Sequence, residues 1–298
     1  MQIEDVATKN HHEATKVTKR VESSCSSCLR GKSHFIEVLL LLILTLTIGT
    51  PTMAQNISRD IVDDLAPSGT LRVAINFGNI VLAQKDPQTG EPRGVSGDLA
   101  REVAKRLGVP IQFVTFDAAG KVVDALKSNA WDLAFLAIDP IRGEGIDFTP
   151  PYVIIEGVYL VPVQSRLKTV EDVDQPGIRI AVGKGSAYDL YLTRSLKHAT
   201  LVRDTTGTGA LDGFLQSGLE AAAGVKQPIV AFAAKHPETR IIPGRFMAIE
   251  QAMAAPKGRT TGARYLRQFI EEMKANGFVA RALAASGQAD ATVAPPAQ

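Results

Sequence analysis

The chain has 298 residues, with 33 lysines and arginines against 31 acids and a formal net charge of +2. So balanced a charge excludes the extended basic surface that nucleic acids require, and no nucleic-acid partner is predicted. Hydrophobic residues make up 45% and charged residues 21%, which excludes a disordered chain and a multi-span membrane protein. The length allows two lobes of ordinary domain size.

An apolar, uncharged run over residues 38–48 is too short to span a bilayer and is followed by small residues that end at Ala54. With the basic residues before it, this run predicts a secretory signal peptide over residues 1–54, cleaved after Ala54. Its basic region is unusually long, which a start site placed too early would explain, and an uncleaved anchor is the alternative. Cys25 and Cys28 precede the run, so the mature chain is expected to lack cysteine altogether.

The first part of the mature chain alternates strands with helices. Hydrophobic periodicity predicts helices over 59–65, 98–107 and 121–128, and strands over 71–75, 111–116 and 131–138. This alternation predicts a mostly parallel sheet that is covered on both faces. Ligands of such sheets bind beyond the carboxyl ends of the strands, so the loops that start at Asn76 and Asp139 are the candidates for a site.

The same pattern then restarts. Strands are predicted over 158–161, 178–182 and 241–242, and helices over 170–173, 186–196, 211–217, 229–235 and 263–276. Residues 207–209 (GTG) are predicted to form a turn. The chain after Ser286 is rich in alanine, proline and glutamine without apolar periodicity, which predicts a disordered tail over 287–298.

Several segments, in order along the mature chain, together resemble one known family. They are GVSGDLAREVAKRLG from Gly94, DLAFLAIDPIR ending at Arg142, IDFTPPY ending at Tyr152, GIRIAVGKGS from Gly177 and AAPKG from Ala254. Together they resemble the bacterial extracellular solute-binding proteins of family 3, the polar amino-acid class.

The resemblance implies an α/β, two-lobed periplasmic binding protein of type II, a Venus flytrap. Each lobe is then a mostly parallel sheet flanked by helices, and two hinge strands near 153–157 and 248–251 connect the lobes. Lobe 1 would comprise residues 55–154 and a return segment, 250–286, and lobe 2 residues 155–249. The implied protein is a periplasmic monomer that passes a small carboxylate-bearing, amino-acid-like solute to an ABC permease in the inner membrane.

Arg142 is the strongest candidate for ligand binding. A planar guanidinium grips a carboxylate through two parallel hydrogen bonds, and the resemblance places Arg142 at the carboxylate clamp of the family. From lobe 2, Ser186 and the backbone amides around Gly185 open a helix, whose amino end attracts carboxylates.

Further candidates surround this pair. Asn76, Phe77 and Asn79 lie in the first strand-to-helix loop, and Tyr188 follows Ser186. Phe77 and Tyr188 are the aromatic residues available to cover the ligand, since Ala119 stands where many relatives carry an aromatic side chain.

Two positions depart from the family pattern. Residues 224–227 (GVKQ) lack the acid that relatives use for the ligand's ammonium group, and Lys226 would favour a second anionic group, as in a dicarboxylate or an oxo acid, if it faced the cleft. Asp139 either binds that ammonium group in place of the missing acid or pairs with Arg142, and the sequence leaves both open.

An enzyme on the same scaffold, of the cyclohexadienyl dehydratase type, is the main alternative. It needs an acid or base in the cleft, for which Asp139 and Glu156 are available. We predict no catalytic residue, no cofactor and no metal, because residues 183–185 lack the spacing of a phosphate loop and no histidines or carboxylates have ligand spacing. A receptor that feeds a membrane sensor is a second alternative, which the sequence does not separate from an importer.

Overall fold

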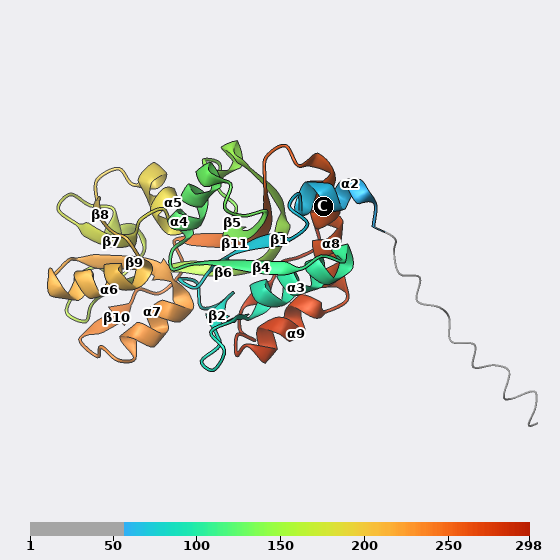
Figure 1. Ribbon diagram of the computed structural model, residues 1–298. Coiled ribbons are helices and arrows are strands. Elements are labelled where there is room, and N and C mark those ends of the chain that lie inside the picture. The colour runs from blue at the N-terminus through green and yellow to red at the C-terminus, as the bar shows by residue number, and fades with distance from the viewer. Residues whose placement is uncertain (1–56) are drawn as a thin grey trace, which may run out of the picture. The chain divides into compact units, whose positions relative to one another are not determined.

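A computed structural model describes residues 57–298 (Figure 1). The predicted signal peptide and both cysteines lie outside this range. Within it, no helix combines the length and the apolar character that crossing a membrane demands.

The first part of the chain forms the predicted alternation of strands and helices. Its elements are α2 (Arg59–Leu65), β1 (Leu71–Asn76), β2 (Gln84–Lys85), β3 (Pro92–Arg93), α3 (Val95–Leu107), β4 (Ile111–Phe116), α4 (Ala119–Asp124), the 3-10 turn η1 (Ala125–Ser128) and β5 (Leu133–Ala137). Strands β2 and β3 form a small hairpin of their own. Helix α3 ends at Gly108, whose φ of 67° is the left-handed conformation that glycine adopts without strain.

The rest of the chain repeats the alternation of strands and helices and then returns to the first half of the sheet through β11 (Met247–Pro256), which pairs with β5. Its elements are η2 (Arg142–Glu144), β6 (Ile146–Pro162), η3 (Glu171–Val173), β7 (Arg179–Gly183), α5 (Ala187–Ser195), β8 (Thr200–Asp204), α6 (Gly207–Gln216), β9 (Ala221–Val225), α7 (Lys226–Ala233), β10 (Thr239–Ile241), β11 (Met247–Pro256), α8 (Thr260–Ala275), α9 (Phe278–Ala285) and β12 (Thr292–Val293).

A single mixed sheet runs through the described part of the chain, with its strands in the order β4-β1-β5-β11-β6-β9-β7-β8. Strand β1 is parallel to β4 and β5, and β7 is parallel to β8 and β9. We call the half built on β4-β1-β5 lobe 1 and the half built on β9-β7-β8 lobe 2. The long antiparallel strands β6 and β11 lie between them, so the two parallel half-sheets are the ones predicted.

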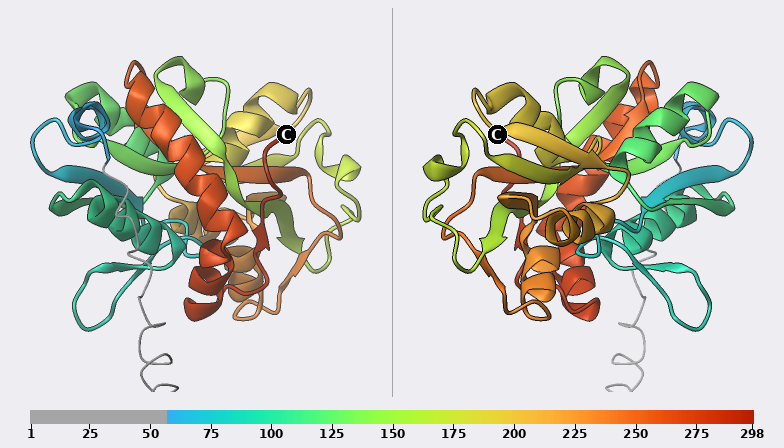
Figure 2. Two further views of the ribbon diagram at one scale, coloured as in Figure 1. Left: turned by 90° about the vertical axis from the view of Figure 1, so that its right-hand side faces the viewer. Right: turned by 90° about the vertical axis from the view of Figure 1, so that its left-hand side faces the viewer.

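The side chains of β1 alternate between two cores, as a strand covered on both faces requires. Val73 and Ile75 pack in a cluster with α3, α8 and α9, whereas Ala74 packs with Val122 and Trp131 on the side of α4. Figure 2 shows α8 as the long orange-red helix that lies across its face of the sheet. Helices therefore cover both faces of lobe 1.

The predicted hinge segments lie side by side and pair with each other. In the antiparallel register of β11 and β6, Ala248 lies opposite Glu156 and Gln251 lies opposite Val153. Strand β6 continues beyond this point and pairs with β9 from Gly157 to Leu160. A single strand therefore runs from lobe 1 into lobe 2.

Three elements differ from the sequence-based expectation for lobe 2, and one of them is β8, which was not predicted and pairs in parallel with β7. Residues 207–209 form the first turn of α6 rather than a loop, because the Thr206 side chain accepts a hydrogen bond from the Gly209 amide at 2.9 Å and caps the helix. Strand β9 was not predicted, since its sequence, AAAGV, has little intrinsic strand preference and becomes a strand through pairing with β6 and β7.

The expectation of a disordered tail over residues 287–298 is wrong. Strand β12 pairs with Val153 and Ile154 of β6, and the Lys274 ammonium donates to the carbonyl of Pro295 at 2.8 Å. Ala294 is only 3% exposed. The tail has no apolar periodicity of its own, and its order comes from the backbone groups that β6 offers along its edge.

Candidate functional site

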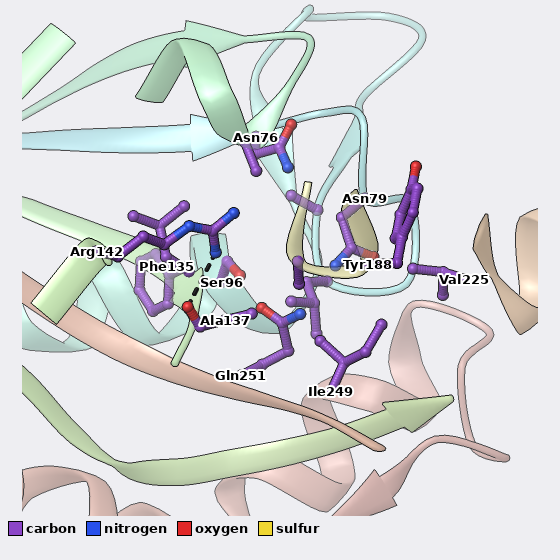
Figure 3. Close-up of a pocket in the computed structure, with 15 residues that line it drawn as sticks. Asn76, Asn79, Ser96, Phe135, Ala137, Arg142, Tyr188, Val225, Ile249 and Gln251 are labelled. Carbon is purple, nitrogen blue, oxygen red and sulfur yellow. Dashed lines mark hydrogen bonds between the residues drawn. The ribbon is translucent and has the colours of Figure 1, made fainter. Parts of the chain in front are cut away.

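A small cavity of about 50 Å³ lies between the lobes, beyond the carboxyl ends of the strands (Figure 3). Asn76 is the last residue of β1, Ala137 the last of β5 and Val225 the last of β9, and all three line the cavity. The polar lining from lobe 1 consists of Asn76, Asn79, Ser96 and Arg142, lobe 2 supplies Ala187, Tyr188 and Val225, and the hinge strand β11 supplies Ile249 and Gln251.

Arg142 is a buried cation in this lining, with 3% of its surface exposed. Its guanidinium donates to the carbonyl of Ala137 at 2.9 Å and, across to lobe 2, to the carbonyl of Gly185 at 2.8 Å. Its Nε atom is buried and has no hydrogen-bond partner among the described residues. Burial lowers the pKa of Arg142 to about 10, against the opposing effect of Asp139, so the side chain keeps its charge at neutral pH.

Asp139 fits neither of the roles expected for it. Its carboxylate accepts a hydrogen bond from Arg194 of α5 at 2.8 Å and another from the amide of Ile141 at 2.9 Å. The side chain is 4% exposed and does not line the cavity. Asp139 therefore pairs with an arginine of lobe 2, and its charge acts on Arg142 only at longer range.

The amino end of α5 contributes differently from the prediction. The Gly185 amide donates to Asp189 at 2.8 Å, and the Ser186 hydroxyl accepts from the Asp189 amide at 3.0 Å, so Ser186 is the N-cap. Neither residue lines the cavity. The first two residues of α5, Ala187 and Tyr188, do line it, and amides at these helix positions have no acceptor within the helix.

The other predicted residues divide between the cavity and its surroundings. Asn76, Asn79 and Tyr188 line the cavity, whereas Phe77 lines a neighbouring space of about 250 Å³ on the far side of Tyr188 and Val225. Lys226 lines neither space, because its ammonium pairs with Glu156 at 2.7 Å. The expectation of a second cation in the cleft is therefore wrong for Lys226.

Among the lining residues that were not singled out from the sequence, Ser96, Phe135 and Gln251 carry polar or aromatic side chains. Ser96 lies in the family's helix motif, and its hydroxyl is 3.2 Å from the hydroxyl of Tyr152. Phe135 packs edge-on against Tyr152, with 6.0 Å between ring centroids. Gln251 is 5% exposed, and the signal that would have found it is its spacing of two from Ile249 and Met253, which puts it on the buried face of the strand.

Two α/β lobes joined by a pair of strands, with a cavity between their strand ends, define a two-lobed solute-binding fold. Residues 71–285 match the bacterial extracellular solute-binding proteins, family 3, and the chain belongs to this family.

Solved structures with the same fold include holo ArgBP from T. maritima and a cysteine-binding protein from Campylobacter jejuni. The first has a TM-score of 0.61 and 24% identity, over 71% of this chain and 93% of that one. The second has a TM-score of 0.65 and 23% identity, over 76% of this chain and 92% of that one. At these identities the likeness concerns the fold.

A curated relative, the cyclohexadienyl dehydratase of Pseudomonas aeruginosa, is 25% identical over 174 residues. The aligned segment covers 57% of this chain and 62% of the relative, so the chain matches about three fifths of the dehydratase.

Proposed function

We propose that the protein is a periplasmic substrate-binding protein that holds a small carboxylate-bearing solute between its lobes and passes it to an ABC permease. The observation that carries this proposal is the buried Arg142, which lines the cavity and keeps an unpartnered Nε atom. A guanidinium in this setting gains most from an anionic group that satisfies the remaining donor. The amides of Ala187 and Tyr188 supply a second attraction for an anion, from the opposite lobe.

The contacts between the lobes support capture by closure. Besides the bond from Arg142 to Gly185, the pair of Arg194 and Asp139 joins α5 to lobe 1. Gly120 and Gly185 let the backbones approach, since a Cβ atom on Gly120 would lie 2.8 Å from the carbonyl of Lys184. A solute held by groups from both lobes would stabilise this closed arrangement over an open one.

The names of structural relatives agree with a carboxylate ligand. One is described as arginine-bound and another as a cysteine-binding protein, and both amino acids carry the carboxylate that Arg142 would bind.

A thermal-shift screen of amino acids, dicarboxylates, oxo acids and hydroxy acids tests this function. A ligand that binds only the folded state raises the unfolding free energy by about 2.7 kcal/mol at a concentration of 100 times Kd. We expect at least one small carboxylate to raise the melting temperature in this way, with sugars and cationic amines as negative controls. A panel in which no carboxylate shifts the transition would contradict the proposal.

The positions of the two candidate catalytic acids favour solute binding over a dehydratase activity. Asp139 and Glu156, the two candidates for acid or base catalysis, lie outside the cavity lining and pair with Arg194 and with Lys226 and Arg245. Incubation with prephenate or arogenate, followed by absorbance, checks this point. Turnover of either compound would reverse the order of the two functions.

Periplasmic delivery is tested by fractionating cells that express the full chain. We expect the protein in the periplasmic fraction, with an intact mass that lacks residues 1–54, because the apolar run before Ala54 has the length of a signal peptide. Mass spectrometry of the purified protein measures this directly. A membrane-bound protein of full-length mass would identify the run as an uncleaved anchor.

A further inference from the structure

Within residues 57–298, the lining of the cavity between the lobes carries a positive charge and no negative one. Arg142 is the one residue with a formal charge among those that line it, and the rest of the described lining is apolar or carries uncharged amides and hydroxyls. A zwitterionic amino acid would bring a carboxylate for Arg142 and, beside it, an ammonium group. The lining offers no carboxylate to that ammonium group.

Two buried acids close in sequence to lining residues, Asp139 and Asp189, are already engaged. Asp139 pairs with Arg194 at 2.8 Å. Asp189 accepts from the Gly185 amide and from Arg203, both at 2.8 Å. Each of these carboxylates is at most 5% exposed and is held in an ion pair with an arginine that is 39% or 40% exposed, so drawing one toward a ligand would break that pair and its hydrogen bonds.

The energetic balance therefore favours a ligand with one negative charge. Burying an ammonium group without a carboxylate partner costs several kcal/mol, and Arg142 would add repulsion between like charges. A singly charged carboxylate instead neutralises Arg142, whose lowered pKa reflects the cost of burying its charge.

The uncharged polar groups indicate what the rest of the ligand carries. The Oδ1 atom of Asn79 is buried without a partner among the described residues, and the Gln251 and Ser96 side chains face the same space (Figure 3). A hydroxyl group next to the carboxylate can donate to the Oδ1 atom of Asn79, and a carbonyl group there can accept from side-chain amide nitrogens or hydroxyls of this kind. The small volume, about 50 Å³, favours a short carbon skeleton.

We propose that the ligand is a short monocarboxylate whose second polar group is uncharged, a 2-oxo or 2-hydroxy acid, in preference to the amino acid of the same skeleton. This inference rests on the proposed function and narrows its ligand class.

Matched trios test the inference by isothermal titration calorimetry: pyruvate, L-lactate and L-alanine, then 2-oxobutyrate, 2-hydroxybutyrate and 2-aminobutyrate. We expect the oxo or hydroxy acid of a trio to bind at least about tenfold more tightly than its amino acid. An amino acid that binds as tightly as its partners overturns the inference but leaves the proposed function standing. If no carboxylate binds, in these trios or in the wider screen, both fail.

A variant that adds a carboxylate to the cavity tests whether the absence of an acid sets the ligand preference. Asn79→Asp places a carboxylate where the unpartnered Oδ1 atom lies, with almost no change in shape. We expect the ratio of oxo-acid to amino-acid affinity to fall at least about tenfold in this variant. Gln164→Glu adds the same charge on an exposed turn and should leave the ratio unchanged. A ratio that is the same in Asn79→Asp and in the parent protein would overturn the inference.

Discussion

Replacing Asp132 by asparagine is expected to lower the free energy of unfolding by about 3 kcal/mol. Asp132 is fully buried just before β5 and accepts two hydrogen bonds from the Arg72 guanidinium, each at 2.8 Å, and one from Arg259 at 2.8 Å. The amide would leave both arginines without a counter-charge. Because the two arginines are 23% and 16% exposed, water offsets part of the loss, and we expect the lower end of the range for broken buried pairs.

The pH dependence of this loss follows from the pKa of Asp132. Burial alone would raise that pKa, but hydrogen bonds from Arg72 and Arg259 outweigh it and hold the pKa below its ordinary value. A lowered pKa stabilises the folded state fully above about pH 4 and loses that contribution as the pH falls through the folded-state value. The difference between parent and variant should therefore shrink below about pH 4.

Urea unfolding at pH 7 and at pH 3 measures both effects. Asp124→Asn is the matched control, since Asp124 forms an exposed pair with Lys127 at 3.5 Å and should change the unfolding free energy by less than about 0.5 kcal/mol. Asp132 lies at the amino end of β5, away from the cavity, so ligand affinity should be unchanged in the folded variant. Equal stability of Asp132→Asn and the parent at pH 7 would contradict the structural role of this network.

Replacing Arg142 by alanine is expected to weaken binding of the carboxylate ligand by about 1.5–3 kcal/mol, or roughly 10- to 150-fold. The variant removes the charge-assisted hydrogen bonds to the ligand and leaves its carboxylate desolvated without a partner. It also removes the bonds to Ala137 and Gly185, the second of which connects the lobes. Calorimetry with the tightest ligand from the screen gives the change in Kd.

Two comparisons separate ligand binding from general effects of charge. Arg142→Lys keeps the positive charge but loses the planar pair of donors, and should bind with intermediate affinity. Lys226→Ala removes a cation that pairs with Glu156 outside the cavity, and should leave Kd within about twofold of the parent. If Arg142→Ala bound the ligand as well as Lys226→Ala does, Arg142 would not be the carboxylate site.

The order of elements was largely predictable because short-range periodicity carries it. The expected strands over 71–75, 111–116 and 131–138 correspond to β1, β4 and β5, and the expected helix over 263–276 corresponds to α8. The misses have long-range causes. Strand β9 depends on its neighbours in the sheet, and the ordered tail depends on an edge of β6 more than 130 residues earlier in the sequence.

The candidate site was predictable in outline but not in its hydrogen bonds. The loop at the end of β1 and the turn that begins at Arg142 both reach the cavity, as the strand-end rule for α/β sheets predicts. The partner of Asp139 is Arg194, 55 positions away, and the partner of Lys226 is Glu156, 70 positions away. No local pattern encodes such pairs.

The sequence by itself determined the parallel half-sheet of lobe 1, because that half-sheet depends on short-range hydrophobic periodicity, and the resemblance of its motifs to a known family indicated the connecting strands and Arg142. Only the tertiary structure decided which charges remain available. It brings Arg194 of α5 against Asp139 of lobe 1, it pairs Asp189 with Arg203 within lobe 2, and it leaves Arg142 as the charge that faces the cavity. The physical reason is that ion pairs form between whichever groups folding brings within a few ångströms, whatever their separation in sequence.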